Sequence, residues 1–119
     1  MSNQSVEWLS CCTPLAGNPL SAEEAAQLAG VLKALADPVR LRIVSLVLAH
    51  EGAEACVCEL SPEFNLTGPT LSHHLKVLYE AGVLDRERRG TWVYYRAVPG
   101  LLARLGELLA PPASLRARV

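Results

Sequence analysis

The stretch TGPTLSHHLKVLYEAGVLDRERRGTWVYYR, from Thr67 to Arg96, decides the fold. Leucines at 71, 75 and 78 have the spacing of one buried helix face, so we expect a helix over 69–81, with Gly82 as its C-terminal cap. Residues 83–88 and 91–96 are predicted as two strands, because they are rich in strand-forming residues and flank the turn Arg89-Gly90. The stretch therefore predicts a helix that leads directly into a β-hairpin.

Three more helices are predicted upstream. A capping-box pattern at Ser21 and Glu24 begins a helix that runs to about residue 36. Asp37-Pro38 begin a second helix, which is apolar nearly all round and is therefore expected to be the central core helix. A short helix is expected over 56–63, before a turn at 65–68. Short helix, tight turn and second helix make a helix-turn-helix, and the hairpin after it has the position of a wing.

Length and composition are those of a small single domain, with 119 residues of which half are apolar. We expect 1–20 to be an N-terminal arm with a cysteine pair, 21–110 to be the winged helix-turn-helix domain, and 111–119 to be a flexible tail. A last helix is expected over 99–109. The predicted fold class is mainly α with a small β-hairpin. No apolar run reaches membrane-spanning length and no secretory signal is evident, so we expect a cytoplasmic protein with no membrane partner.

The charge distribution points toward nucleic acid. Residues 67–119 carry eight of the 11 Lys and Arg residues but only four of the 12 Asp and Glu residues. Basic residues gather in this way where one face of a protein approaches phosphate, although an ordinary uneven surface is the alternative. The second helix of a helix-turn-helix enters the major groove, with its N-terminal residues near the base edges. Together with hairpin arginines, the candidate DNA-binding residues are Thr67, Thr70, Ser72, His73, Lys76, Arg86, Arg88 and Arg89.

Interpretations in which these residues have no contact with DNA remain open. His73 and His74 point in different directions on a helix, so they are not expected to chelate one metal ion together. The alternative for this pair is one surface residue and one packed residue, with no role as ligands. The hairpin arginines alternate with Asp85 and Glu87, as in a solvated charged strand pair.

Four cysteines form two tight pairs, Cys11-Cys12 and Cys56-Val57-Cys58. In the cytosol such pairs are more often metal-binding or redox-active than structural disulfides, and thiolates select soft ions. Cys56 and Cys58 diverge on an ideal helix, but they can converge if Cys56 lies at the frayed helix N-terminus. The alternatives are a buried cysteine that serves only as a small hydrophobe, a redox switch, a thiol carrier that binds no DNA, and a thiol-disulfide enzyme. The last lacks its usual Cys-x-x-Cys motif.

Four stretches resemble the ArsR/SmtB family of winged-helix metalloregulatory repressors: 32–43, 55–60, 69–78 and the wing segment 81–95, within a similarity over roughly 22–109. The resemblance implies a homodimer, without enzyme activity, that binds a palindromic operator in double-stranded DNA. It also implies repression of a resistance operon and release when a toxic ion binds. Members dimerise through their first and last helices, where the candidate residues are Leu28, Leu32, Leu101 and Leu105.

The Cys-Val-Cys motif, followed by Glu59, resembles that of the arsenic-responsive and cadmium/lead-responsive branches. Related arsenic sensors join an N-terminal Cys-Cys pair to a cysteine of the opposite protomer. The resemblance therefore implies a metal site made of Cys11, Cys12 and Cys56, with Cys58 as substitute or fourth ligand. As(III) is the expected inducer, with Sb(III) similar in chemistry. Cd(II), Pb(II) or Zn(II) bound by all four thiolates, and a thiol-redox signal, are the alternatives.

Overall fold

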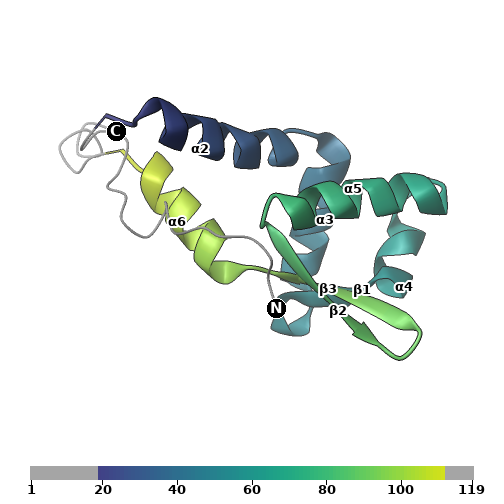
Figure 1. Ribbon diagram of the computed structural model, residues 1–119. Coiled ribbons are helices and arrows are strands. Elements are labelled where there is room, and N and C mark those ends of the chain that lie inside the picture. Colours follow the sequence, from purple (N-terminus) through teal and green to yellow (C-terminus); the bar gives the residue numbers. More distant parts are fainter. Residues whose placement is uncertain (1–18, 112–119) are drawn as a thin grey trace.

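The computed structural model describes residues 19–111 (Figure 1). In chain order the elements are α2 (Ala22–Leu35), α3 (Pro38–Ala49), the 3-10 turn η1 (Glu51–Ala53), β1 (Glu54–Cys56), α4 (Val57–Leu60), the 3-10 turn η2 (Ser61–Glu63), α5 (Gly68–Glu80), β2 (Leu84–Arg89), β3 (Trp92–Ala97) and α6 (Pro99–Leu109). The predicted fold, mainly helical with a β-hairpin wing, is confirmed. Cys11, Cys12 and the tail after Pro111 lie outside the described residues.

Local hydrogen bonds set the starts of α2 and α3. Ser21 Oγ accepts the Glu24 N–H at 3.1 Å, and Glu24 Oε1 accepts the Ser21 N–H at 3.0 Å, which is the predicted capping box. At α3, Asp37 Oδ2 accepts the Arg40 N–H at 3.1 Å, with Pro38 in the first turn. These bonds satisfy N–H groups that a helix start otherwise leaves without a partner.

Helix α3 is central, but only one side of it is buried. Ile43 and Val47 are fully enclosed and Val44 is nearly so, whereas Leu41 and Leu48 are about half exposed. The helix that was expected to be the central core helix therefore contributes one side to the core, although it is apolar nearly all round. Leu41 and Leu48 are seven residues apart and share a face, and the other elements of the described chain leave that face largely uncovered.

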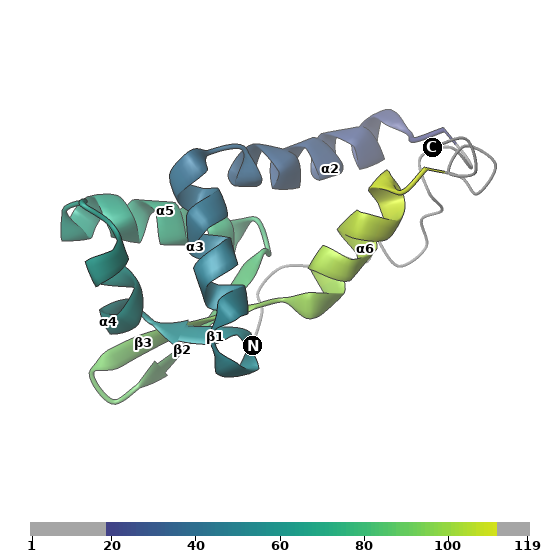
Figure 2. The ribbon, with the colours of Figure 1, turned by 180° about the vertical axis from the view of Figure 1, so that it is seen from behind.

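Helices α4 and α5 form the helix-turn-helix, and α5 ends in the predicted glycine cap (Figure 2). Gly82 has a φ of +83°, and its N–H donates to the Tyr79 carbonyl at 3.0 Å. The Val83 N–H donates to the Leu78 carbonyl at 3.0 Å. This pair of bonds is a Schellman motif, which needs a left-handed residue where Gly82 stands. The turn directs the chain from α5 into β2.

The hairpin has a third strand, β1, that the sequence analysis did not predict. The sheet order is β1-β3-β2, and both pairings are antiparallel. Glu54 is paired with Arg96, Ala55 with Tyr95 and Cys56 with Tyr94. Three residues are too few for hydrophobic periodicity to reveal a strand. Because of β1, the chain passes from the sheet directly into α4 at Cys56.

Figures 1 and 2 show α2 and α6 projecting together on the side away from the hairpin tip. Of the four leucines implied for dimerisation, Leu32 is 37% exposed. Leu28, Leu101 and Leu105 are buried within the single chain. Leu32 is therefore the member of this set that has the largest surface available to a partner. None of the helices described between residues 19 and 111 is both long and apolar enough to cross a membrane.

Candidate DNA interface and thiol site

Helix α5 has a leucine face and a polar face, as predicted. Leu71, Leu75 and Leu78 are at most 3% exposed and anchor the helix in the core. The opposite face presents the four predicted polar or basic residues to solvent: Thr70, Ser72, His73 and Lys76. Hydroxyl, imidazole and ammonium groups on one exposed helix face can contact base edges and phosphates.

Thr67 is the N-cap of α5, so its position is set by the helix start. Its Oγ1 accepts the Thr70 N–H at 3.3 Å and donates to Thr70 Oγ1 at 2.9 Å. The two hydroxyls therefore hold each other at the exposed N-terminus of the helix. This is the end of the second helix that lies nearest the bases in other helix-turn-helix proteins.

His74 is a packed residue, which was one of the two interpretations left open for the histidine pair. Its Nδ1 lies 3.2 Å from Arg40 Nη1 and 3.9 Å from Asp37 Oδ2. Arg40 also donates from Nε to the Ala34 carbonyl at 2.6 Å, so this group ties α5 to the α2–α3 corner. The pKa of Asp37 is lowered, mainly because its carboxylate accepts the Arg40 backbone N–H.

Strand alternation divides the predicted hairpin arginines between two faces of the sheet. Arg86 and Arg88 are on the same face as buried Leu84, toward α5, and the Arg86 guanidinium lies 4.0 Å from the Tyr79 ring centroid. Arg88 is exposed, and within residues 19–111 no carboxylate pairs with it. Arg89 is on the opposite face.

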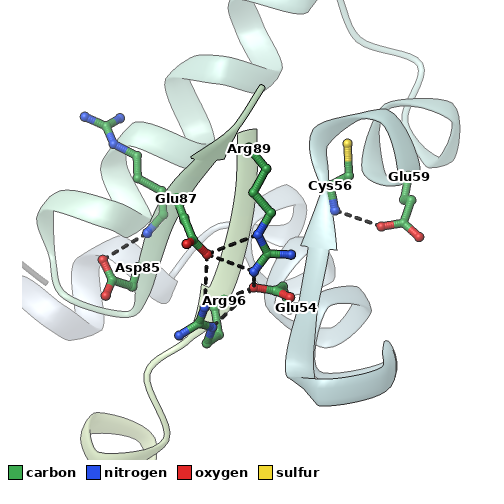
Figure 3. Close-up of polar contacts among 8 residues, drawn as sticks. Glu54, Cys56, Glu59, Asp85, Glu87, Arg89 and Arg96 are labelled. Atoms are coloured by element: carbon green, nitrogen blue, oxygen red, sulfur yellow. Dashed lines mark hydrogen bonds and ion pairs between the residues drawn. The ribbon is translucent and has the colours of Figure 1, made fainter. Parts of the chain in front are cut away.

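Arg89 belongs to a set of four charged residues that we call the wing ion cluster: Glu54, Glu87, Arg89 and Arg96 (Figure 3). Arg89 Nη2 lies 2.6 Å from Glu54 Oε2 and 2.8 Å from Glu87 Oε1. Arg96 Nη2 lies 3.1 Å from the same Glu54 oxygen. The cluster has two positive and two negative groups, so the charge of Arg89 is neutralised locally.

The pKa shifts in the wing ion cluster follow these contacts. The pKa of Glu54 is lowered, mainly by the hydrogen bond from Arg89 and further by that from Arg96. The pKa of Arg89 is raised, first by its bond to Glu87 and then by that to Glu54. Sequence reasoning found Arg89 but missed Glu54 and the pairing with Arg96. The alternation of charges in 85–89 signalled ion pairs, but nothing in the sequence placed Glu54 beside them.

The structure brings the sulfur atoms of Cys56 and Cys58 together, as a disulfide, with 5.1 Å between the Cα atoms. Cys56 is the N-cap of α4, and its Sγ accepts the Cys58 N–H at 3.1 Å. The Cys56 N–H in turn donates to Glu59 Oε1 at 2.8 Å. The condition under which the sequence allowed the pair to converge is therefore met, because Cys56 lies at the helix start. Cys56 is 1% exposed, whereas Cys58 is exposed.

The donor set fits a soft, thiophilic ion only in part. Two adjacent sulfur atoms are soft ligands, and His50 Nε2 lies 3.8 Å from Glu59 Oε2 beside them. Among the residues that the structure describes, no group of three or more His, Cys, Asp or Glu side chains is placed to hold a metal ion. A three-thiolate site therefore needs sulfur from elsewhere, and Cys11 and Cys12 are the other two cysteines of the chain.

Comparison with known proteins places these features in a family. Residues 37–86, from α3 into the hairpin, match the family model described as bacterial regulatory protein, arsR family. An arsenic resistance transcriptional regulator of Pseudomonas putida is 51% identical over 69 residues, which cover 58% of this chain and 52% of that protein. The match thus spans about half the length of that relative. An arsenical resistance operon repressor of Bacillus subtilis is 44% identical over 75 residues, covering 60% of this chain and 70% of the relative.

A solved structure has the same architecture. It is a homodimeric winged helix-turn-helix DNA-binding domain from Mycobacterium bovis, described as a possible ArsR-family transcriptional regulator. It superposes with a TM-score of 0.60 at 31% identity, covering 85% of this chain and 90% of that one. These relatives are regulators and not enzymes, in agreement with the expectation that the chain has no catalytic site.

Proposed function

The chain belongs to the ArsR family of bacterial regulatory proteins, and from this premise we propose that it is a transcriptional repressor of arsenical resistance genes. It binds operator DNA through α5 and the wing, and it leaves the operator when As(III) or Sb(III) binds its cysteine thiolates. The observation that carries the proposal is the position of the Cys56–Cys58 pair, at the junction of β1 with the first helix of the helix-turn-helix.

The DNA-binding surface combines the polar face of α5 with one face of the wing. Lys76 is suited to phosphate, and the hydroxyls of Thr70 and Ser72 are suited to bases or phosphates. We assign a further contact with the DNA phosphate backbone to Arg88, because Arg88 is exposed on the α5 side of the sheet. We assign no phosphate contact to Arg89, because two carboxylates already neutralise it. Repression of this kind takes place in the cytoplasm, where the chromosome lies.

The functional unit is a homodimer on a palindromic operator. A two-fold dimer presents two copies of α5, and the spacing of two half-sites on DNA matches that symmetry. The homodimeric M. bovis relative supports this assembly. The interface that we propose combines α2 and α6, with exposed Leu32 as a direct contact and with Leu28, Leu101 and Leu105 setting the shape of the two helices from within.

For the inducer site we propose thiolates of Cys56 and Cys58 together with Cys11 and Cys12 of the arm, brought from the partner protomer. As(III) takes three thiolates, so one of the four sulfur atoms is spare. Burial of Cys56 and exposure of Cys58 favour Cys58 as the sulfur that an approaching arm reaches first. Cd(II), Pb(II) or Zn(II) bound by all four thiolates remains the alternative within the same family.

A second candidate function is favoured by one specific observation, the disulfide between Cys56 and Cys58. In this case an oxidant such as peroxide takes two electrons from the two thiols, two protons are released, and the S–S bond forms. The repressor then responds to the thiol redox state without any ion. The exposure of Cys58 gives an oxidant access to the pair.

The deciding experiment is a titration of DNA from the upstream region of the gene, at fixed salt, with fully reduced protein. We expect As(III) to weaken binding, and a variant with all four cysteines replaced by serine to stay bound. Release of that variant by As(III) would refute the proposal. Peroxide in place of As(III) tests the redox candidate, and a panel of divalent ions tests the alternative of a response to Cd(II), Pb(II) or Zn(II).

Single replacements then identify the ligands. If Cys58→Ser keeps the As(III) response and loses only that to divalent ions, the site is Cys11, Cys12 and Cys56. If Cys56→Ser keeps the response and Cys58→Ser loses it, Cys58 is the third ligand. Loss of the response in both variants indicates that both sulfur atoms of the pair are needed.

A further inference from the structure

The wing ion cluster and the thiol pair share one short strand. Glu54 begins β1 and Cys56 ends it, and residues two apart in a strand are on the same face of the sheet. Figure 3 shows the Glu54 carboxylate directed toward Arg89 and Arg96, which come from β2 and β3. The strand that carries the thiol therefore also holds the two arginines of the hairpin.

A second chain of contacts joins the same residues. Cys56 is paired with Tyr94 across the sheet. The Arg89 guanidinium lies 4.4 Å from the Tyr94 ring centroid, and Arg89 donates to Glu54 at 2.6 Å. Cys56, Tyr94, Arg89 and Glu54 thus form a chain of neighbours that starts and ends on β1, in which each residue is paired with or contacts the next.

From this geometry we propose that Glu54 is a positioning residue that couples the state of Cys56 and Cys58 to the orientation of the DNA-binding wing. The inference rests on the proposed function, since it concerns how a change at the thiols reaches the DNA surface. In the structure Cys56 caps α4 and pairs with β3, and Glu54 holds the hairpin through Arg89 and Arg96; we take these contacts of Glu54 as those of the DNA-binding state.

The physical argument concerns the length of β1. Its three residues pair with β3 along their whole length, so a sulfur that moves to bind a ligand cannot shift Cys56 without shifting its neighbours. Glu54 is the only acidic residue of β1, and its Oε2 accepts hydrogen bonds from both arginines. Displacing it by about 1 Å breaks its charge-assisted bonds to both arginines at once, because such bonds need donor and acceptor within about 3 Å. The hairpin then loses its side-chain attachment to the strand that leads into the helix-turn-helix.

The test compares Glu54→Gln with the control Asp85→Asn. Both changes remove one negative charge from the same face of the sheet. Asp85 accepts only its neighbour's backbone N–H among the bonds of the described chain, so the control leaves the wing ion cluster intact. For each protein the measured quantity is the coupling ratio, the DNA dissociation constant with saturating As(III) divided by that without it.

We expect Glu54→Gln to lower the coupling ratio by about 2- to 30-fold and Asp85→Asn to leave it near the wild-type value. As(III) stoichiometry and affinity, measured without DNA, should be unchanged in both. A purely structural role for Glu54 would lower the melting temperature and shift both DNA constants by the same factor, which leaves the ratio unaltered. A wild-type ratio in Glu54→Gln overturns the proposal.

Arg89→Gln provides an independent variant and completes a double-mutant cycle. If Glu54 acts through Arg89, the double variant should have no lower coupling ratio than either single variant, whereas additive losses would contradict that route. Hydrogen exchange in 54–56 should rise when As(III) binds wild-type protein in the absence of DNA. If wild-type protein keeps its operator in As(III), the proposed function itself fails; if it is released while Glu54→Gln and Arg89→Gln are released equally well, only the coupling role of Glu54 fails.

Discussion

Replacement of Arg88 by alanine should reduce the salt dependence of DNA binding, and the same replacement of Arg89 should not. Each phosphate contact contributes about 0.9 to the slope of log affinity against log salt. A homodimer has two copies of Arg88, so losing one contact per copy makes the slope less steep by about 1.8. The affinity lost between about 50 and about 200 mM salt should then shrink by roughly tenfold. Arg89 gives no such change, because Glu54 and Glu87 lie 2.6 and 2.8 Å from its guanidinium.

The measurement is a fluorescence anisotropy titration of labelled operator DNA at four or five salt concentrations, with fully reduced wild-type, Arg88→Ala and Arg89→Ala proteins. Arg88 is exposed, so its replacement should alter the free energy of unfolding by no more than about 0.5 kcal/mol, which circular dichroism can check. A loss of slope in Arg89→Ala equal to that in Arg88→Ala would refute the division of the arginines between two faces.

Three further predictions concern the fold and its pH dependence. Leu78→Ala should cost about 2–5 kcal/mol in urea unfolding at fixed protein concentration, because Leu78 is fully buried, and a cost below 1 kcal/mol would contradict its place in the core. Gly82→Ala should cost about 1–2 kcal/mol, since φ there is +83°; an unchanged midpoint would argue against the Schellman cap. Folding lowers the pKa of Asp37 from its ordinary 3.8, so its contribution is complete above that pH and is lost as pH falls below it. Asp37→Asn keeps a capping side chain but has no carboxyl group to titrate, so it should reduce the loss of stability as pH falls below 3.8. An unchanged loss of stability in acid would count against this assignment.

Much of the fold followed from local patterns. The capping box at Ser21, the Asp37-Pro38 helix start and the leucine face of α5 were all predicted and are present, because each depends on residues within one or two helical turns. The convergence of Cys56 and Cys58 was also predictable, since an N-cap residue leaves the helical path. The exposure of Leu41 and Leu48 was not, because an apolar helix does not reveal which of its sides a single chain will cover.

The wing illustrates the limit of sequence reasoning about the site. The arginines of 86–89 were visible as candidates, but from the sequence alone Arg88 and Arg89 were equivalent candidates for a DNA contact. In the pleated strand the side chains of Arg88 and Arg89 lie on opposite faces of the sheet. Glu54, more than 30 residues upstream of Arg89, therefore helps to neutralise Arg89 and not Arg88.

By itself the sequence determined the order of the helices, the helix-turn-helix with its wing, the polar face of α5 and the presence of two thiol pairs, since all of these depend on short-range spacing. Only the tertiary structure decided that β1 joins the hairpin, that Glu54 meets Arg89 and Arg96, and that His74 packs against Arg40. These are contacts between residues far apart in the chain. Their partners depend on how strands pair and how helices cross, and no local pattern records that choice.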